Sequence, residues 1–307
     1  MLGRSKSVVA LAIALFPSQA IVKITLGSSF ASFLLRFLSF IGLSLMVALT
    51  ACTSEQAAED RTINIESTAI PAAAAPGPEM SGLLQSTSPS YVTLTVAQSR
   101  RTGKIGDGDP ALAVTSGSGF VVDNDGHVLT AGHVAVKAGF NVTARASDGH
   151  LYSGRVIALQ PNNDMALIKL SPFEGKPVQP ASGPCMAKGE AVFSLGKPHA
   201  EGDIARLGEV ESMSFGRAVS YNGFGYPDAM VLRMNTKKGE SGGPLFNSSG
   251  RLTGMVVSTL SDGNGRPLNL AHAVPTTALA EFLCSHTSCS AAWQNLARQS
   301  TKSCTGA

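Results

Sequence analysis

Short runs of apolar and β-branched residues, separated by turn residues, follow one another along the chain from residue 90 to residue 275. In YVTLTVA (91–97) apolar side chains recur at every second position, which is typical of a β-strand with one buried face. Asp125-Gly126 and Asp148-Gly149 mark turns between such runs. The predicted strands are residues 91–97, 119–123, 127–130, 151–159 and 165–170, then 191–195, 205–212, 229–233, 252–259 and 268–274.

The predicted strands fall into two sets of similar length, divided by a Pro/Gly-rich boundary near residues 180–184. We therefore expect an all-β fold with two packed barrels or sandwiches, at about 89–180 and 181–275, and a cleft between them. A helical pattern follows only at 276–284, with another possible helix at 291–298. These helices are expected to pack on the outside.

The N-terminal part of the chain reads as an export signal. An apolar run at 37–51 follows Arg36 and precedes Cys52, so residues 1–51 are expected to be a signal peptide. A second apolar patch at 8–16 exceeds what one signal peptide needs and suggests a translation start further downstream. LTAC (49–52) resembles the bacterial lipobox, which implies lipidation of Cys52 and a periplasmic, membrane-anchored lipoprotein. An uncleaved membrane anchor and a secreted protein remain alternatives.

Residues 52–88 are expected to be a flexible tether after the lipidated cysteine. The segment is rich in Ala, Ser, Pro and Glu and shows no sustained helical or strand period. Its length allows an anchored domain to stand clear of a membrane surface.

Composition and charge support a globular body without a nucleic-acid partner. With 44% apolar and 15% charged residues, the chain can bury a sizeable core. The formal charge of +3 depends on four basic residues before Cys52, whose removal leaves 20 basic against 21 acidic residues. That balance gives no reason to expect nucleic-acid binding.

Three local sequences carry candidate chemistry: LTAGHV (129–134), NDMALIK (163–169) and GESGGPL (239–245). They supply His133, Asp164 and Ser241 in the chain order of a trypsin-like triad. A serine hydroxyl is a weak nucleophile at neutral pH, so a neutral imidazole must take its proton during attack. We assign this role to His133, while a buried Asp164 would hold the ring in the correct tautomer.

A tetrahedral intermediate also needs two donors for its oxyanion. Glycine two residues before the nucleophile lets the backbone turn its amide inward, so the N–H groups of Gly239 and Ser241 are the predicted oxyanion hole. No metal or other cofactor is implied, because none of the histidines, His127 among them, has Cys, Asp or Glu at metal-ligand spacing.

The body resembles the trypsin-like serine protease family, and specifically its bacterial HtrA/Deg-type branch. The matching blocks are GSGFVVDNDGHVLTAGHVA, SGRVIALQPNNDMALIKL, KGEAVFSLGKP, ARLGEVESMS and ESGGPLFNSSGRLTGMVV. The resemblance implies two six-stranded β-barrels within a protease domain at 89–283, a short C-terminal helix and a Cys-containing tail at 284–307. It implies protein or peptide substrates and an endopeptidase reaction through an acyl-enzyme on Ser241.

Details of the sequence depart from the HtrA/Deg pattern. Only 66 residues follow Ser241, which leaves no room for the PDZ domain usual in that branch. Glu240 resembles the acidic residue before the nucleophile of trypsin, and we expect it to pair with a cation such as Lys237, Lys238 or Arg233. By analogy with trypsin, Asn235 is assigned to the base of the substrate pocket, which Val257 and Ser258 also line. Because Asn235 is not acidic, a preference for Arg or Lys is not implied.

Two alternatives stay open at this point. GESGG also fits the G-x-S-x-G elbow of α/β-hydrolases, with Asp262 and His272 downstream, but that elbow needs a helix directly after the serine. A trypsin-fold lipoprotein with a binding or chaperone-like role and an unformed active site is the second alternative. Cys185, Cys284, Cys289 and Cys304 allow two disulfides in three pairings, and the sequence does not choose among them.

Overall fold

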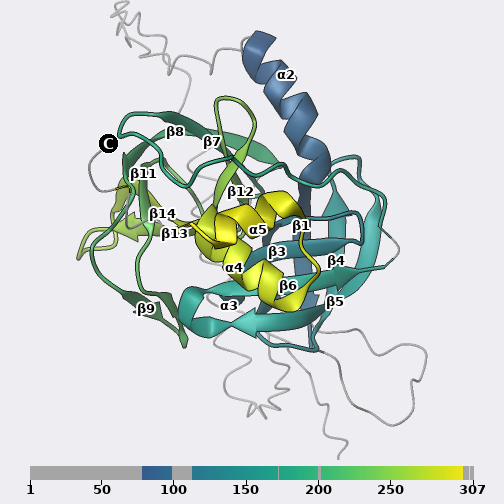
Figure 1. Cartoon of the computed structure of the whole chain (residues 1–307). Coiled ribbons are helices and arrows are strands. Elements are labelled where there is room, and N and C mark those ends of the chain that lie inside the picture. The colour runs from purple at the N-terminus through teal and green to yellow at the C-terminus, as the bar shows by residue number, and fades with distance from the viewer. Residues whose placement is uncertain (1–77, 99–112, 172, 200–201, 300–303, 305–307) are drawn as a thin grey trace, which may run out of the picture. The chain divides into compact units, whose positions relative to one another are not determined.

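The computed structural model describes residues 78–98, 113–171, 173–199, 202–299 and 304. Two closed antiparallel barrels, each of six strands, dominate this part of the chain (Figure 1). The predicted all-β class and the two six-stranded barrels are confirmed. The predicted signal peptide, the predicted lipidation site at Cys52 and the first part of the predicted tether lie outside the described residues.

The first barrel contains β1 to β6 in the order β1-β2-β3-β6-β5-β4, and β4 closes it by pairing with β1. Its strands are β1 (Tyr91–Ala97), β2 (Ala113–Val121), β3 (His127–Ala131), β4 (Asn141–Ala146), β5 (Leu151–Gln160) and β6 (Met165–Leu170). Val92, Leu94 and Val96 are buried at alternate positions of β1, so the period of two in the sequence matches an inward-facing row.

The second barrel contains the strands β11-β14-β13-β12-β7-β8 in that order. Its strands are β7 (Ala191–Gly196), β8 (Ile204–Ser212), β11 (Met230–Arg233), β12 (Pro244–Asn247), β13 (Leu252–Ser261) and β14 (Pro267–Pro275). Met230, Leu232, Leu245, Ala271 and Ala273 form its buried core cluster together with neighbouring side chains. Alternate residues of β11 and β14 thus face the barrel interior.

A hairpin between β8 and β11 has no counterpart in the sequence prediction. It consists of β9 (Val219–Tyr221) and β10 (Phe224–Tyr226), joined by Asn222 and Gly223, which both have positive φ. An Asn-Gly pair with two positive φ angles is the preferred two-residue turn of a hairpin. The pair with its flanking aromatic residues was therefore a signal that the strand prediction missed.

Helices lie outside the barrels. They are α2 (Pro78–Thr87), α3 (Gly132–Ala135), α4 (Thr276–His286) and α5 (Ala291–Ala297), with 3₁₀ turns η1 (Ser88–Ser90) and η2 (Pro161–Asn163). The yellow helices α4 and α5 in Figure 1 pack on each other, and α4 contacts β6 of the first barrel as well as β13 and β14 of the second. Disulfides join Cys185 to Cys304 and Cys284 to Cys289, which selects one of the three pairings.

Helix α2 corrects the end of the expected tether. Residues 78–87 are helical, and Met80, Leu83 and Leu84 pack against the hydrophobic core. The Thr87 hydroxyl donates to the Leu83 carbonyl and closes the last turn. Tertiary burial of three apolar side chains overrides the weak helical period of this segment. Within the part of the chain that the structure describes, no helix combines the length and apolar character needed to cross a bilayer.

Candidate active site

His133 lies where the edge of the first barrel turns into helix α3. Strand β3 ends at Ala131, and the Gly132 N–H donates to the Asp164 carbonyl at 2.9 Å, which fixes the start of the helical turn. The His133 Nδ1 lies 2.9 Å from Asp164 Oδ2 and 3.1 Å from Oδ1. About a quarter of the His133 side chain is exposed, so the ring is open to an incoming group on its other side.

Asp164 is fully buried between η2 and β6. It has φ +47°, a left-handed conformation that Asp tolerates better than most residues and that starts strand β6 at the next residue. Its carboxylate accepts hydrogen bonds from the His133 backbone N–H at 2.9 Å and from the His133 ring. The Tyr221 hydroxyl of β9 also donates to Oδ2. Three donors thus offset the cost of burying this carboxylate.

Ser241 belongs to the loop that leads into β12, and it reaches across to the first barrel. Ser118 of β2 donates its N–H to the Ser241 carbonyl at 2.9 Å and its hydroxyl to the Gly239 carbonyl at 2.9 Å. A Cβ on Gly242, which has φ +84°, would lie 2.2 Å from the Ser118 carbonyl oxygen. The loop therefore needs glycine at this position and holds Ser241 against the first barrel by two hydrogen bonds from one buried residue.

The backbone N–H of Gly239 points away from His199. The His199 N–H donates to the Lys238 carbonyl at 3.1 Å. Because the C=O and N–H of one trans peptide point in opposite directions, the Gly239 N–H points away from His199. Neither this N–H nor that of Ser241 donates to any partner among the described residues. Both amides therefore keep an unused hydrogen-bond donor within this part of the chain.

Glu240 carries a buried charge directly before Ser241. It is 2% exposed, and the Arg206 guanidinium of β8 donates to its Oε1 at 2.8 Å. The expectation that Glu240 pairs with a cation is confirmed, and Arg206 is a partner that the sequence analysis did not name. Arg233, one of the three cations it did name, pairs with Glu209 and Glu211.

The Ser241 hydroxyl donates to the Val257 carbonyl of β13 at 3.3 Å. Val257 is buried, and the hydroxyl of the next residue, Ser258, lies 2.8 Å from the Tyr226 hydroxyl. Two of the three predicted pocket residues therefore lie on the strand that adjoins Ser241. Asn235 is exposed, whereas its neighbour Thr236 is buried and hydrogen-bonds Thr259 of β13 at 2.7 Å.

His272 is a buried ionisable group behind Ser258. Its Nδ1 lies 2.7 Å from the Tyr226 hydroxyl, its ring contacts the Phe215 ring in a tilted arrangement with centroids 4.3 Å apart, and its Nε2 has no hydrogen-bond partner among the described residues. Burial lowers the pKa of His272 to about 4, so it is neutral near pH 7. Burial likewise raises the pKa of Tyr226 to about 12, which keeps its hydroxyl protonated.

A groove of about 270 Å³ lies beside Gly239. Its lining is mostly polar or basic and includes Gly117, which contacts Val134 next to His133, and Lys197 and His199, which border Gly239. The remaining lining residues are Thr93, Leu94, Thr95, Ser116, Thr143, Arg145 and Leu151. The groove therefore borders the loop before Ser241 on the side of Lys197 and His199, opposite to the direction of the Gly239 N–H.

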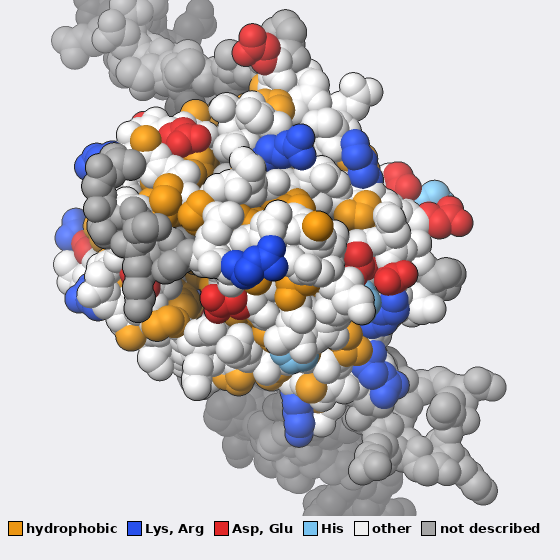
Figure 2. All heavy atoms as spheres, in the orientation of Figure 1, with side chains coloured by type: hydrophobic (Ala, Val, Ile, Leu, Met, Phe, Trp, Pro, Cys, Tyr) orange, Lys and Arg blue, Asp and Glu red, His pale blue; other side chains and the backbone are white. Residues whose placement is uncertain are grey.

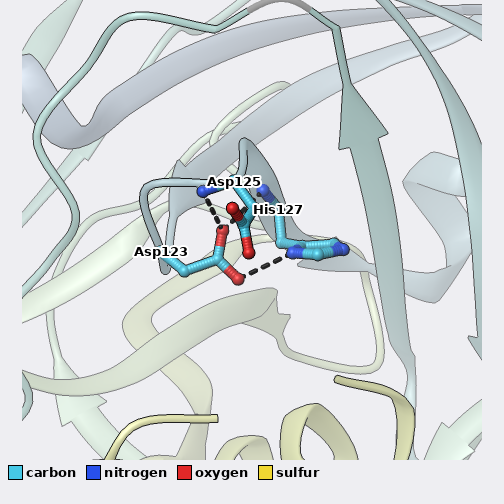
Figure 3. Close-up of side chains that lie close together, drawn as sticks. All are labelled: Asp123, Asp125 and His127. Carbon is cyan, nitrogen blue, oxygen red and sulfur yellow. Dashed lines mark hydrogen bonds and ion pairs between the residues drawn. The ribbon is translucent and has the colours of Figure 1, made fainter. Parts of the chain in front are cut away.

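His127 does have acidic neighbours, contrary to the sequence analysis. Figure 3 shows its ring facing Asp123, with Asp125 on the same turn, and the ligand atoms of the three lie within 4.8 Å of one another. Asp123 Oδ1 accepts the N–H groups of Asp125 and His127, and Oδ2 lies 2.6 Å from His127 Nδ1. The Asp123 carboxylate thus organises the β2–β3 turn.

The α/β-hydrolase alternative does not fit the structure. Strand β12, not a helix, begins three residues after Ser241. Asp262 caps its own surface turn by accepting N–H groups from Asn264 and Arg266, and His272 is held by Tyr226. Residues from both barrels, and not this downstream pair, surround Ser241.

Comparison with known families agrees with this fold. Residues 117–255 match the family model described as trypsin-like peptidase domain. The fold is that of a trypsin-like peptidase. The structure of this trypsin-like domain is similar to the Rv3671c protease of Mycobacterium tuberculosis in its inactive form, with a TM-score of 0.53, 24% identity and coverage of 69% of this chain and 97% of the other. It is also similar to the HtrA-type protease AlgW with tripeptide, at a TM-score of 0.57 and 19% identity, covering 67% of this chain and 62% of that one.

Curated relatives of the trypsin-like domain are proteases. The chain is 28% identical over 211 residues to protease Do-like 5, chloroplastic, of Arabidopsis thaliana, which covers 63% of this chain and 64% of that protein. It is 32% identical over 166 residues to a probable periplasmic serine endoprotease DegP-like of Brucella suis, covering 53% of this chain and 31% of the relative. The chain thus spans less than two thirds of the length of these relatives. The similarities support a serine protease.

Proposed function

We propose that this protein is a serine endopeptidase whose nucleophile is Ser241, with His133 as general base and Asp164 as the carboxylate behind it. The observation that carries the proposal is the 2.9 Å hydrogen bond between His133 Nδ1 and a fully buried Asp164 carboxylate. A ring held in this way carries its proton on Nδ1, because Asp164 accepts only from a protonated nitrogen. Nε2 is then free to take the proton of a serine hydroxyl.

The reaction begins with attack of Ser241 Oγ on a peptide carbonyl while His133 Nε2 takes the hydroxyl proton. The imidazolium that forms is stabilised by the Asp164 charge, and His133 then returns the proton to the leaving amine. The N–H groups of Gly239 and Ser241 are proposed to receive the developing oxyanion. Support for this assignment comes from their lack of partners among the described residues. A water molecule, activated by His133 in the same way, then attacks the acyl-enzyme and releases the carboxylic acid product.

We further propose that the domain acts outside the cytoplasm, anchored through a lipidated Cys52 and a tether that ends where α2 begins. The apolar run at 37–51 and the lipobox-like LTAC (49–52) support this location. The Brucella relative is described as periplasmic, in agreement with export. Metabolic labelling with a fatty-acid analogue tests the anchor, because Cys52→Ser should abolish incorporation and release the protein from membranes.

One observation favours the second candidate, a trypsin-fold protein with a binding role. The Ser241 hydroxyl donates to the Val257 carbonyl, so its proton is directed away from His133 in this conformation. A rotation about the Cα–Cβ bond would move this half-buried hydroxyl from one staggered position to another. If that rotation does not occur, the protein would bind peptides without cleaving them.

Proteolysis of an unfolded substrate distinguishes the two functions. Purified residues 78–307 are incubated with reduced, alkylated casein, and fragments are followed by gel and mass spectrometry. The endopeptidase proposal expects internal cleavage by the wild type and none by Ser241→Ala. Binding of casein by both proteins, with no new fragments from either, would support the binding role instead.

A further inference from the structure

Tyr221 stands next to the proposed catalytic residues but belongs to none of the motifs that predicted them. Its hydroxyl donates to Asp164 Oδ2 and lies 3.5 Å from His133 Nδ1. The same ring meets the His133 imidazole edge-on, with centroids 5.6 Å apart. Tyr221 therefore contacts both members of the His133–Asp164 pair.

The β9–β10 hairpin is held at this place by several contacts. Phe224, on the second strand, meets the His133 ring edge-on at 6.5 Å, and strand β10 packs on η2, which leads into Asp164. Tyr226 joins the hairpin to Ser258 and His272 of the second barrel. Because these contacts hold the hairpin in place, the Tyr221 hydroxyl is preorganised and loses little conformational freedom when it donates to Asp164.

We infer that Tyr221 is a positioning residue, which fixes the Asp164 carboxylate and sets how strongly that carboxylate supports a proton on His133. Asp164 is fully buried and accepts one hydrogen bond from the His133 backbone and one from the His133 ring. The Tyr221 hydroxyl supplies the remaining donor on Oδ2, the oxygen that also faces Nδ1. This inference rests on the proposed peptidase function.

Tyr221 can act in this way across the working pH range because it stays a donor. Burial, together with the Asp164 charge, raises the pKa of Tyr221 far above neutrality. The ionisable groups facing His133 from the packed elements are Asp164 after η2 and Tyr221 on β9, with Tyr226 behind Tyr221 at 6.2 Å between ring centroids. Removing the Tyr221 hydroxyl takes away its hydrogen bond to Asp164 and its weaker 3.5 Å approach to His133 Nδ1, while a phenylalanine keeps the ring contact.

The test is Tyr221→Phe in the full-length protein, measured with a quenched-fluorescence peptide from pH 5 to 10. The substitution keeps the ring packing and removes only the hydroxyl. Loss of one hydrogen bond to a charged group predicts a fall in kcat of roughly tenfold to a hundredfold, with KM little changed. Because Asp164 then keeps more of its charge for the imidazolium, the acid limb of the kcat/KM profile moves to higher pH.

Tyr152→Phe is the matched control, since the Tyr152 hydroxyl donates to the Glu174 carbonyl at an exposed site. It should leave rate and pH profile as in the wild type. A Tyr221→Phe enzyme with wild-type kcat and an unmoved acid limb would overturn the inference, and so would an increase in KM alone. If Tyr221→Phe does not fold, fluorotyrosine at position 221 keeps a more acidic hydroxyl and should move the acid limb to lower pH.

A measurement that needs no turnover separates the two proposals. The low-field proton resonance of His133 Nδ1, recorded by NMR, reports its hydrogen bond to Asp164. We expect this resonance to move in Tyr221→Phe and to stay in place in Tyr152→Phe. An unmoved resonance in Tyr221→Phe would contradict the inference. Absence of cleavage by the wild type, with a resonance that does move, would reject the peptidase function and keep Tyr221 as the residue that positions Asp164.

Discussion

The Arg206 guanidinium donates to the buried Glu240 carboxylate at 2.8 Å, one residue before Ser241. We expect Glu240→Gln to lower the free energy of unfolding by about 3 to 5 kcal/mol, because it removes the buried negative charge of the Arg206–Glu240 ion pair. Urea denaturation followed by tryptophan fluorescence measures the loss. Turnover should fall as well, since Glu240 lies between the two amides of the proposed oxyanion hole.

The double variant Arg206→Met/Glu240→Met is the control for the Glu240 prediction. Removing both charges should be less harmful than removing one, because neither charge of the pair then has to be desolvated. If the losses of Arg206→Met and Glu240→Met add up to the loss of the double variant, the two charges are not coupled and this role of Glu240 is contradicted.

Gly239 has φ +101°, and a Cβ there would lie 2.4 Å from the Lys197 carbonyl oxygen. Gly239→Ala must therefore shift the loop and turn its N–H from the proposed oxyanion position. A loss of roughly a hundredfold to a thousandfold in kcat is expected, measured with the quenched peptide at saturating concentration. Gly263→Ala, where nothing lies within 4 Å of the added Cβ, should retain wild-type activity.

Because His272 is buried in the second barrel, we expect the free energy of unfolding to fall at acid pH. Its folded pKa of about 4 lies below the ordinary value of 6.5, so folding favours the neutral ring. The contribution is fully present above pH 6.5 and is lost as the pH falls towards 4, by about 3 kcal/mol. Asp228, which raises this pKa, and Arg217, which lowers it, are the charged neighbours.

The check for His272 is urea unfolding at pH 7 and pH 4.5. His272→Phe should lose clearly less stability between these values than the wild type. His150→Gln alters an exposed histidine and should behave like the wild type. Parallel pH curves for the wild type and His272→Phe would show that His272 does not contribute to acid sensitivity.

The two disulfides should differ in their contribution to stability. The Cys185–Cys304 bond spans 119 residues, whereas Cys284–Cys289 spans 5. Loop-closure entropy predicts a loss of about 5 kcal/mol for Cys185→Ser/Cys304→Ser and about 2 kcal/mol for Cys284→Ser/Cys289→Ser. Denaturant midpoints of the two double variants test this order. Equal losses would mean that unfolded-chain entropy does not govern the difference.

Surface charge on the face drawn in Figure 2 is mixed. Lys and Arg side chains lie among Asp and Glu side chains and apolar ones, without a large patch of one sign. The near-balance of charge in the sequence after residue 51 predicts such a surface.

Much of the fold follows from local sequence patterns. Strands β1 and β6 have the bounds predicted from YVTLTVA and MALIKL. Alternate apolar residues in the first and continuous apolar residues in the second mark where each buried strand begins and ends. Strand β4 was missed, since its inward residues Val142, Ala144 and Ala146 are mostly small and give a weak apolar signal. Strands β9 and β10 have three residues each, too few to show a period.

The candidate site could be predicted only where its residues lie in local motifs. His133, Asp164 and Ser241 each stand in a short recognisable run, and the chain order of the three was sufficient to group them. Ser118, Arg206 and Tyr221 lie 121, 34 and 57 residues from the partners they hold. Contacts of that range depend on how strands pair and barrels pack, and no pattern in one sequence specifies them.

The most direct test of the peptidase proposal is covalent labelling of Ser241. Residues 78–307 are incubated with a fluorophosphonate, digested, and mapped by mass spectrometry. The account predicts one adduct, on the peptide that contains Ser241, with labelling abolished in Ser241→Ala and strongly slowed in His133→Ala. An unlabelled wild type, or an adduct that persists in Ser241→Ala, would contradict it.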